Sequence, residues 1–400
     1  MPVTVEGGRP PRSAPPTGNP LHRPEVRQLV YQVALAVGLI VFIWEILSNA
    51  ATNLRRQNVA AGFDFLGRTS GFDISQTLID YSAQSTFGRA ILVGLVNTLI
   101  VSAIGIVLAT LIGFVVGIAR LSSNWLIAKI AAAYVEVARN VPLLLQLFVW
   151  YFAVAINLPP PRQSYVVPGG GFLSSRGVYL PRPVAEDGFG WVLLALVLAI
   201  CGSIVYALRA SKLQRATGRR LPVLWPTLGL LVGLPLVAAV VTGFPVSFDY
   251  PQLRGFNFAG GMSLQPEMFA MILGLVFYTG GYIAEIVRAG IAGVGTGQKE
   301  AARALGLPNG SVMRLVVIPQ ALRIIIPPLT SQYLNLTKNS SLGIAIAFPD
   351  LTHTLANTTL NQTNQAIETI AILMGIYLTI SLVTSAFMNW FNRRMALVER

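Results

Sequence analysis

Long apolar stretches alternate with short polar segments along most of the chain. A helix needs about 20 mostly apolar residues to cross a bilayer. The six clearest candidates are Leu29 to Ser48, Ile91 to Ala119, Val192 to Leu208, Val223 to Gly243, Phe269 to Val287 and Ile370 to Trp390. Two less regular stretches, Pro142 to Ile156 and Leu322 to Phe348, add further candidates. The pattern therefore predicts an all-α polytopic membrane protein with about eight transmembrane helices.

The segments between the spans differ in composition. Residues 1–28 are rich in Pro and Gly and predict a disordered tail, and residues 29–90 hold the first span and an external segment. Pro159 to Gly190 contains PPPRQ, PGGGF and LPRP without periodicity, which predicts an external loop. Thr242 to Gln265 places four aromatic residues among Gly and Pro, which predicts a structured surface at the membrane interface.

Composition and charge support a membrane location. The chain is 54% hydrophobic and 11% charged, and its formal net charge is +13. The cations lie mainly in short loops between apolar runs, so they indicate membrane topology rather than a nucleic-acid partner. With both termini in the cytosol, the cytosolic cations include Arg209, Lys212, Arg215, Arg219, Arg220, Arg288, Lys299, Arg303, Arg314, Arg393 and Arg394.

Signals for catalysis or metal binding are missing from the sequence. It has no GxxxxGK[ST] loop to hold ATP phosphates, and GVGTG at Gly293 to Gly297 has the wrong spacing for a dinucleotide site. His22 and His353 have no Cys or carboxylate ligands nearby. We therefore expect no catalytic residue, no metal site and no cofactor in this chain.

Pro142 predicts a break within the stretch that begins near Trp125, because proline removes a helical hydrogen bond. Before the break, Glu136 and Arg139 are three residues apart and are expected to pair on one helical face, either as a structural pair or in contact with substrate. Beyond it, Gln146 enters the membrane. These three residues are candidates for a translocation pathway.

A compact polar loop follows the Phe269 to Val287 span. Gln298 to Leu305 predicts a short amphipathic helix that Gly306 ends with a left-handed C-cap. Prolines then direct the chain back into the membrane. Small and apolar side chains along this helix are suited to the groove of a partner protein: Ala301, Ala302, Ala304, Leu305 and Leu307.

This loop resembles the EAA loop of importer permeases of the ATP-binding-cassette (ABC) class. The matching residues are Glu300, Ala301, Ala302, Gly306, Val316, Ile318 and Pro319. Ala138 to Phe152 and Tyr333 to Ile346 resemble segments of the polar-amino-acid branch of that family. In layout the chain is most similar to the long permease of general L-amino-acid and glutamate/glutamine importers.

The resemblance implies a five-helix permease core made of residues 91–156 and 266–392, with a cytosolic coupling loop at 289–320. Residues 157–265 would be an insertion with two extra spans, and residues 393–400 a cytosolic tail. The residues implied in coupling to the ATPase are Glu300, Ala301, Ala302, Leu305, Gly306 and Leu307. The chain would form a pathway for L-amino acids, without catalysis of its own.

The resemblance also implies partners and a location. A second permease chain, identical or, as we expect, different, would complete the pore beside membrane lipid. Two cytosolic ATPase subunits would bind ATP and Mg, and a soluble external protein would deliver the amino acid. The location would be the bacterial plasma membrane.

Polar residues recur within the Leu322 to Phe348 span. Ser331, Asn335, Lys338 and Asn339 follow helical spacing, and an intramembrane Lys faces a polar cavity or a partner by default. We predict that Lys338 lines the translocation pathway, where it attracts a substrate carboxylate. Pairing with a carboxylate of this chain or of its partner is the alternative.

Two other classes of membrane protein are alternatives to an importer permease. A secondary transporter predicts inverted repeats, and the sequence shows none. A membrane enzyme predicts clustered His or acidic residues at one membrane face. Co-purification of ATPase subunits distinguishes both from an ATP-driven importer.

Overall fold

The computed structural model describes residues 24–56, 62–218 and 221–395. They form two units. The first contains α1 (Pro24–Arg56) and Thr363–Glu368, and in it the Gly62 amide donates to Glu368 Oε1 at 2.7 Å. Most of the tail expected at residues 1–28 lies outside the described residues.

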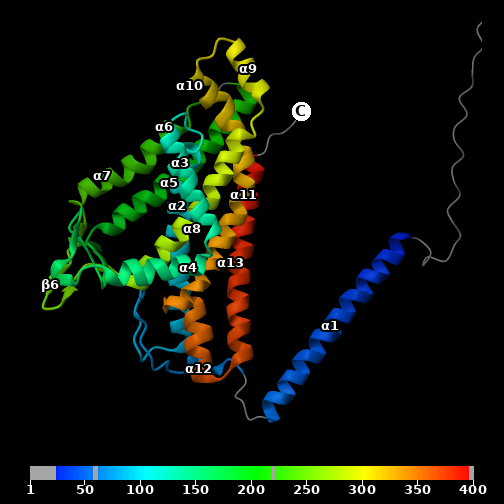
Figure 1. Cartoon of the computed structure of the whole chain (residues 1–400), viewed down its shortest axis with the longest axis vertical. Coiled ribbons are helices and arrows are strands. Elements are labelled where there is room, and N and C mark those ends of the chain that lie inside the picture. Colours follow the sequence, from blue (N-terminus) through cyan, green and yellow to red (C-terminus); the bar gives the residue numbers. More distant parts are fainter. Residues whose placement is uncertain (1–23, 57–61, 219–220, 396–400) are drawn as a thin grey trace, which may run out of the picture. The chain divides into compact units, whose positions relative to one another are not determined.

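Helices dominate the second unit (Figure 1). Its α-helices are α2 (Phe87–Ala119), α3 (Trp125–Asn140), α4 (Leu143–Phe148), α5 (Phe189–Thr217), α6 (Leu224–Leu228), α7 (Leu234–Val241), α8 (Pro266–Ala292), α9 (Thr296–Ala304), α10 (Asn309–Val312) and α11 (Ile318–Asn339). Two more helices are shared with the first unit: α12 (Leu360–Thr363) ends at the first residue of its Thr363–Glu368 segment, and α13 (Ala366–Met395) begins within that segment.

Tighter or wider helical turns extend several of these helices. They are η2 (Asp64–Gly67), η3 (Val149–Val154), η4 (Ala155–Asn157), η5 (Pro161–Gln163), η6 (Gly229–Gly233), η7 (Met313–Val317), η8 (Ser340–Ile346) and η9 (His353–Thr359). Among the described residues, seven helices are long and apolar enough to cross a membrane, and the bent α3 and α4 pair would make eight. The predicted class, an all-α polytopic protein with about eight spans, is confirmed.

The predicted break at Pro142 is also confirmed. Val141 has the extended backbone (φ −89°, ψ 126°) that a following proline favours, and it separates α3 from α4. The helical segments on its two sides are bent by 107°. After the bend, α4 continues through η3 and η4 as far as Asn157.

Short strands occupy the two segments rich in Gly and Pro. A four-stranded antiparallel sheet has the order β1 (Tyr165–Val167), β2 (Gly171–Ser174), β3 (Gly177–Leu180), β8 (Met262–Leu264). Two strand pairs join β4 (Arg182–Ala185) to β5 (Val246–Asp249), and β6 (Gln252–Arg254) to β7 (Asn257–Ala259). The segment Pro159 to Gly190, predicted to be an external loop, contains short strands. They were not foreseen, because strands of three or four residues are too short to produce a clear alternation.

The core of the second unit forms where α2, α8 and α11 pack together, around buried Leu275, Ile283, Ile325 and Leu336. Glycines bring these helices close. A Cβ added to Gly117 of α2 would lie 2.7 Å from the Ala284 carbonyl oxygen of α8. Helices in membranes approach each other through such small residues, because dispersion contacts drive their association. By contrast, α5 and α7 pack mainly on each other.

We expect Gly117→Ala to destabilise the protein by about 1–3 kcal/mol, because the new methyl group would lie 2.7 Å from the Ala284 carbonyl oxygen and 2.8 Å from the Val287 Cβ. The matched control is Gly202→Ala in α5, where the nearest atom to an added Cβ lies 3.8 Å away. Thermal unfolding in detergent measures both. Equal melting temperatures for the two variants would contradict this packing.

Candidate functional site

The loop after α8 contains the predicted amphipathic helix, now defined as α9. Gly306 follows it with φ +76°, a left-handed conformation that glycine adopts at little cost. The Gly306 amide donates to the Arg303 carbonyl at 2.9 Å and the Leu307 amide to the Ala302 carbonyl at 3.3 Å. This pair of bonds is a Schellman motif, which fixes the end of the helix. The predicted C-cap at Gly306 is confirmed.

The six residues expected in ATPase coupling divide into two sets. Ala302 is buried and Leu307 is half-buried, and both belong to the main core, so they hold α9 against the protein. Glu300, Ala301, Leu305 and Gly306 are exposed, and Leu305 is 82% exposed. Such an exposed leucine on a rigid helix end can enter a partner's groove. Figure 1 shows α9 and α10 at one end of the second unit.

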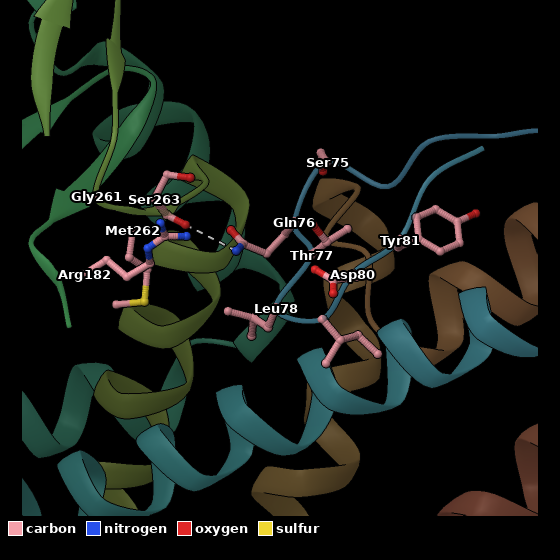
Figure 2. Close-up of a pocket in the computed structure, with 11 residues that line it drawn as sticks. Ser75, Gln76, Thr77, Leu78, Asp80, Tyr81, Arg182, Gly261, Met262 and Ser263 are labelled. Carbon is pink, nitrogen blue, oxygen red and sulfur yellow. Dashed lines mark hydrogen bonds between the residues drawn. The ribbon is translucent and has the colours of Figure 1, made fainter. Parts of the chain in front are cut away.

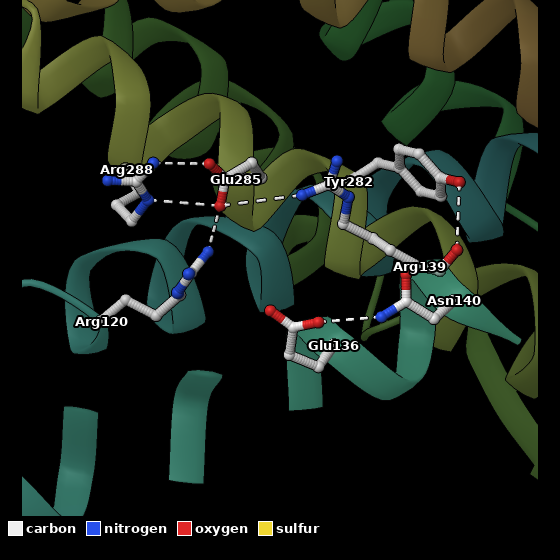
Figure 3. A network of polar contacts seen from close by, with 7 residues as sticks. All are labelled: Arg120, Glu136, Arg139, Asn140, Tyr282, Glu285 and Arg288. Atoms are coloured by element: carbon white, nitrogen blue, oxygen red, sulfur yellow. Dashed lines mark hydrogen bonds and ion pairs between the residues drawn. The ribbon is translucent and has the colours of Figure 1, made fainter. Parts of the chain in front are cut away.

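A cluster of charged residues, called here the Glu285 cluster, joins three helices just before this loop (Figure 3). The Glu285 carboxylate of α8 accepts hydrogen bonds from Arg120, which caps the C-terminus of α2, and from Arg288, at 2.6 Å. Arg139 of α3 lies 4.0 Å from the same carboxylate, and its guanidinium lies over the Tyr282 ring. Glu285 thus pairs with Arg288 of its own helix, and one carboxylate links α2, α3 and α8.

The predicted pairing of Glu136 with Arg139 was wrong. Glu136 instead accepts a hydrogen bond from Asn140 Nδ2 at 2.8 Å (Figure 3). Arg139 turns toward Glu285, because α3 crosses α8 closely there: a Cβ added to Gly281 would lie 2.5 Å from the Ala138 Cβ. Sequence spacing along α3 carried no information about this crossing.

The candidate pathway residues lie in different places. Ser331, Asn335 and Lys338 are exposed on one face of α11, and Asn339 beside them is half-buried. The opposite face packs into the core through buried Leu329 and Leu336. Lys338 forms no ion pair with the part of the chain that the structure describes. The sequence left two environments for Lys338, the translocation pathway or an ion pair with a carboxylate. An ion pair with a described carboxylate of this chain is not observed.

Gln146 lies in α4, within one turn of the break at Val141 and Pro142. Its Nε2 donates to the carbonyls of Ala138 at 3.0 Å and Val141 at 2.9 Å, and its side chain is buried. Its Oε1 has no hydrogen-bond partner among the described residues. Gln146 thus binds two carbonyls at the break in the helix. It belongs to a different helix from the exposed polar residues of α11.

A buried carboxylate, Asp350, was not anticipated from the sequence. Its Oδ1 accepts from the His353 amide at 2.7 Å, and its side chain is fully buried. This burial raises the pKa of Asp350 to about 7. The neighbouring Pro349 carbonyl accepts from Asn97 Nδ2 of α2 at 2.9 Å. Asp350 therefore stabilises the turn that fastens the chain after η8 to α2.

Among the described residues, no three His, Cys, Asp or Glu side chains are grouped so that they could hold a metal ion. His22 lies outside the described residues.

Comparison with known proteins identifies the family. Residues 216–397 match the family described as "Binding-protein-dependent transport system inner membrane component". The general L-amino acid transport system permease protein AapQ of Rhizobium johnstonii is 53% identical over 380 residues, 95% of each chain. The putative amino-acid ABC transporter permease protein YhdX of Escherichia coli is 51% identical, over 94% of this chain and 96% of that one.

A third relative is BztB of Rhodobacter capsulatus, a glutamate/glutamine/aspartate/asparagine transport system permease protein. It is 40% identical, over 92% of this chain and 93% of that one. The fold and the matches define a membrane-spanning transport subunit. The chain belongs to the family of binding-protein-dependent ABC transporter permeases. Permeases of this family are not catalytic, need no cofactor of their own, and work with ATPase and substrate-binding subunits.

We expect Glu285→Gln to lower the free energy of unfolding by roughly 1–2 kcal/mol, because three guanidinium groups would then repel one another without a carboxylate between them. The value is modest because Arg139 keeps 42% of its side chain exposed. Thermal unfolding measures the change. The matched control is Glu136→Gln, whose carboxylate contacts Asn140; an equal effect of both substitutions would refute the role of Glu285.

Proposed function

We propose that this chain forms part of a pathway for L-amino acids across the bacterial plasma membrane, and that α9 transmits the movement of partner ATPases to it. The observation that carries the proposal is the connection of α9 to the transmembrane helices. It continues α8 after a short turn, and α8 is joined to α2 and α3 at the Glu285 cluster. A displacement of α9 would therefore move three helices together.

The cargo is inferred from the relatives and from α11. AapQ, YhdX and BztB are all described as amino-acid permeases. Exposed Ser331, Asn335 and Lys338 give α11 a polar face, which is costly toward lipid and suits a wet pathway. The Lys338 ammonium would attract a substrate carboxylate. Gln146, Glu136 and Arg139 would line the same pathway, near the break and the Glu285 cluster.

The division of the chain and its orientation are part of the proposal. Residues 91–156 and 266–392 would form the core, and residues 157–265 an insertion, in line with the packing of α5 and α7 mainly on each other. The end that carries α9 would face the cytosol, as would both termini. Its basic residues, among them Lys299, Arg303 and Arg314, agree with the positive-inside rule.

The partners would be a second permease, of different sequence, two ATPase subunits that bind ATP and Mg, and a soluble external amino-acid-binding protein. Transport would proceed by alternating access. Closure of the ATPases would move α9, and the connected helices would open the polar pathway to the other side.

We expect Gly306→Val to reduce uptake while ATP hydrolysis continues. No atom lies within 4 Å of an added Cβ, so the local cost comes from the left-handed backbone, about 1–2 kcal/mol. Distortion of this helix end would displace Leu305. Uptake and substrate-stimulated ATP hydrolysis in proteoliposomes test this.

The control for Gly306 is Gly295→Val at the other end of α9. An added Cβ at Gly295 also meets open space, but its φ of −51° is allowed for valine. Normal coupling in the Gly306 variant would refute the proposed role of the helix end.

We expect Lys338→Gln to slow amino-acid uptake by roughly tenfold, which corresponds to about 1.4 kcal/mol of lost charge attraction. Lys212→Gln, near the end of α5, is the matched control. Competition among amino acids in reconstituted vesicles measures both rate and selectivity. If rate and selectivity both stay as in the unmodified transporter, Lys338 does not line the pathway.

A further inference from the structure

A polar cavity lies between the segment that precedes α2 and the strands that precede α8 (Figure 2). Its volume is about 510 Å³. One wall is Ser75–Tyr81, and the other contains Arg182 of β4 and the residues from Gly261 to Ser263 at β8. The cavity therefore joins Ser75–Tyr81 to distant parts of the chain, since Ser263 follows Gln76 by 187 positions.

Buried Gln76 holds the two walls together. Figure 2 shows its side chain reaching across to Ser263, whose carbonyl accepts from Gln76 Nε2 at 3.2 Å. Gln76 Oε1 accepts from the Gln265 amide at 2.9 Å. The Gln76 carbonyl accepts from Asn97 Nδ2 of α2 at 2.8 Å. These three bonds fix the cavity before any guest arrives.

Hydrogen bonds also hold the conformation of the cavity wall that precedes α2. The Tyr81 hydroxyl donates to the Phe72 carbonyl at 2.8 Å and contacts Ser70 Oγ at 2.8 Å. Arg89 Nε donates to the Asp80 carbonyl at 2.9 Å. This arrangement fixes Asp80 on the cavity wall without occupying its carboxylate.

Of the two charged side chains that line the cavity, Arg182 has an ion-pair partner and Asp80 has none among the described residues. Arg182 is already paired, because its guanidinium lies 3.5 Å from Asp249. Asp80 is exposed and forms no ion pair with any described residue. The cavity thus offers one available carboxylate, which complements a basic group.

The position of the cavity relative to α9 restricts its guest. The cavity wall at β8 directly precedes α8, and α9 follows the other end of that helix. Because α8 has 27 residues, it is roughly 40 Å long, enough to cross the bilayer. The cavity therefore opens on the membrane face opposite to α9, where no ATPase can reach it.

We propose that this cavity receives a Lys or Arg side chain of the soluble binding protein when that protein docks. The inference rests on the proposed function, which places a binding protein on this face. Sites for small molecules are mostly apolar and enclose their ligand, whereas this cavity is polar and its charged side chains are exposed. A protruding basic side chain that excludes water from Asp80 fits these properties better.

The test titrates the binding protein against ATP hydrolysis by the reconstituted transporter. We expect Asp80→Lys to raise the half-maximal concentration of binding protein about three- to tenfold, and Asp80→Asn to raise it less. The maximal rate at saturating binding protein should be retained. At 0.5 M salt, roughly, the difference from the unmodified transporter should shrink.

Glu186→Lys is the matched control, because Glu186 is an exposed carboxylate just after β4 that does not line the cavity. Its titration should superimpose on that of the unmodified transporter. A superimposed titration for Asp80→Lys would overturn the inference. Failure of the binding protein to stimulate the unmodified transporter would instead contradict the proposed function.

Discussion

The attraction between one carboxylate and three guanidinium groups organises this protein. Glu285 lies within α8, and α8 contacts α2, α3 and α11. Charged groups near the bilayer are costly unless they pair, so Glu285 brings the C-terminal ends of α2 and α3 to one point. Close contacts at Gly117 and Gly281 permit the approach, since larger side chains there would separate the helices.

The two surfaces for which we propose functions lie at opposite ends of α8. Exposed Leu305 lies beyond the C-terminal end of α8, and the cavity with Asp80 lies at its N-terminal end. The segments before α2 and α8 form the two cavity walls, and the same two helices meet at the Glu285 cluster. A guest that moves one wall relative to the other would thus act on the helices that carry α9. Under the proposed function, this connection would link docking of the binding protein at the cavity to α9.

Features set by local chemistry could be predicted from the sequence. The spans followed from apolar length, the bend from Pro142, and the end of α9 from Gly306. Features that depend on contacts between distant segments could not. Arg120 and Glu285 are 165 positions apart, and nothing in either segment indicates the other. Glu136 and Arg139 had suitable spacing, yet the close crossing of α3 and α8 gave Arg139 a different partner. The strands near the cavity were missed because each is only three or four residues long.

We propose that the Glu285 cluster makes α9 and the transmembrane helices α2, α3 and α8 move together. The most direct test is the number of amino-acid molecules transported per ATP hydrolysed in proteoliposomes, compared between the unmodified transporter and Glu285→Gln. A ratio does not depend on how much protein is folded, so loss of stability alone leaves it unchanged. We expect the Glu285→Gln transporter to continue hydrolysing ATP but to transport clearly fewer amino-acid molecules per ATP. An unchanged ratio would contradict it.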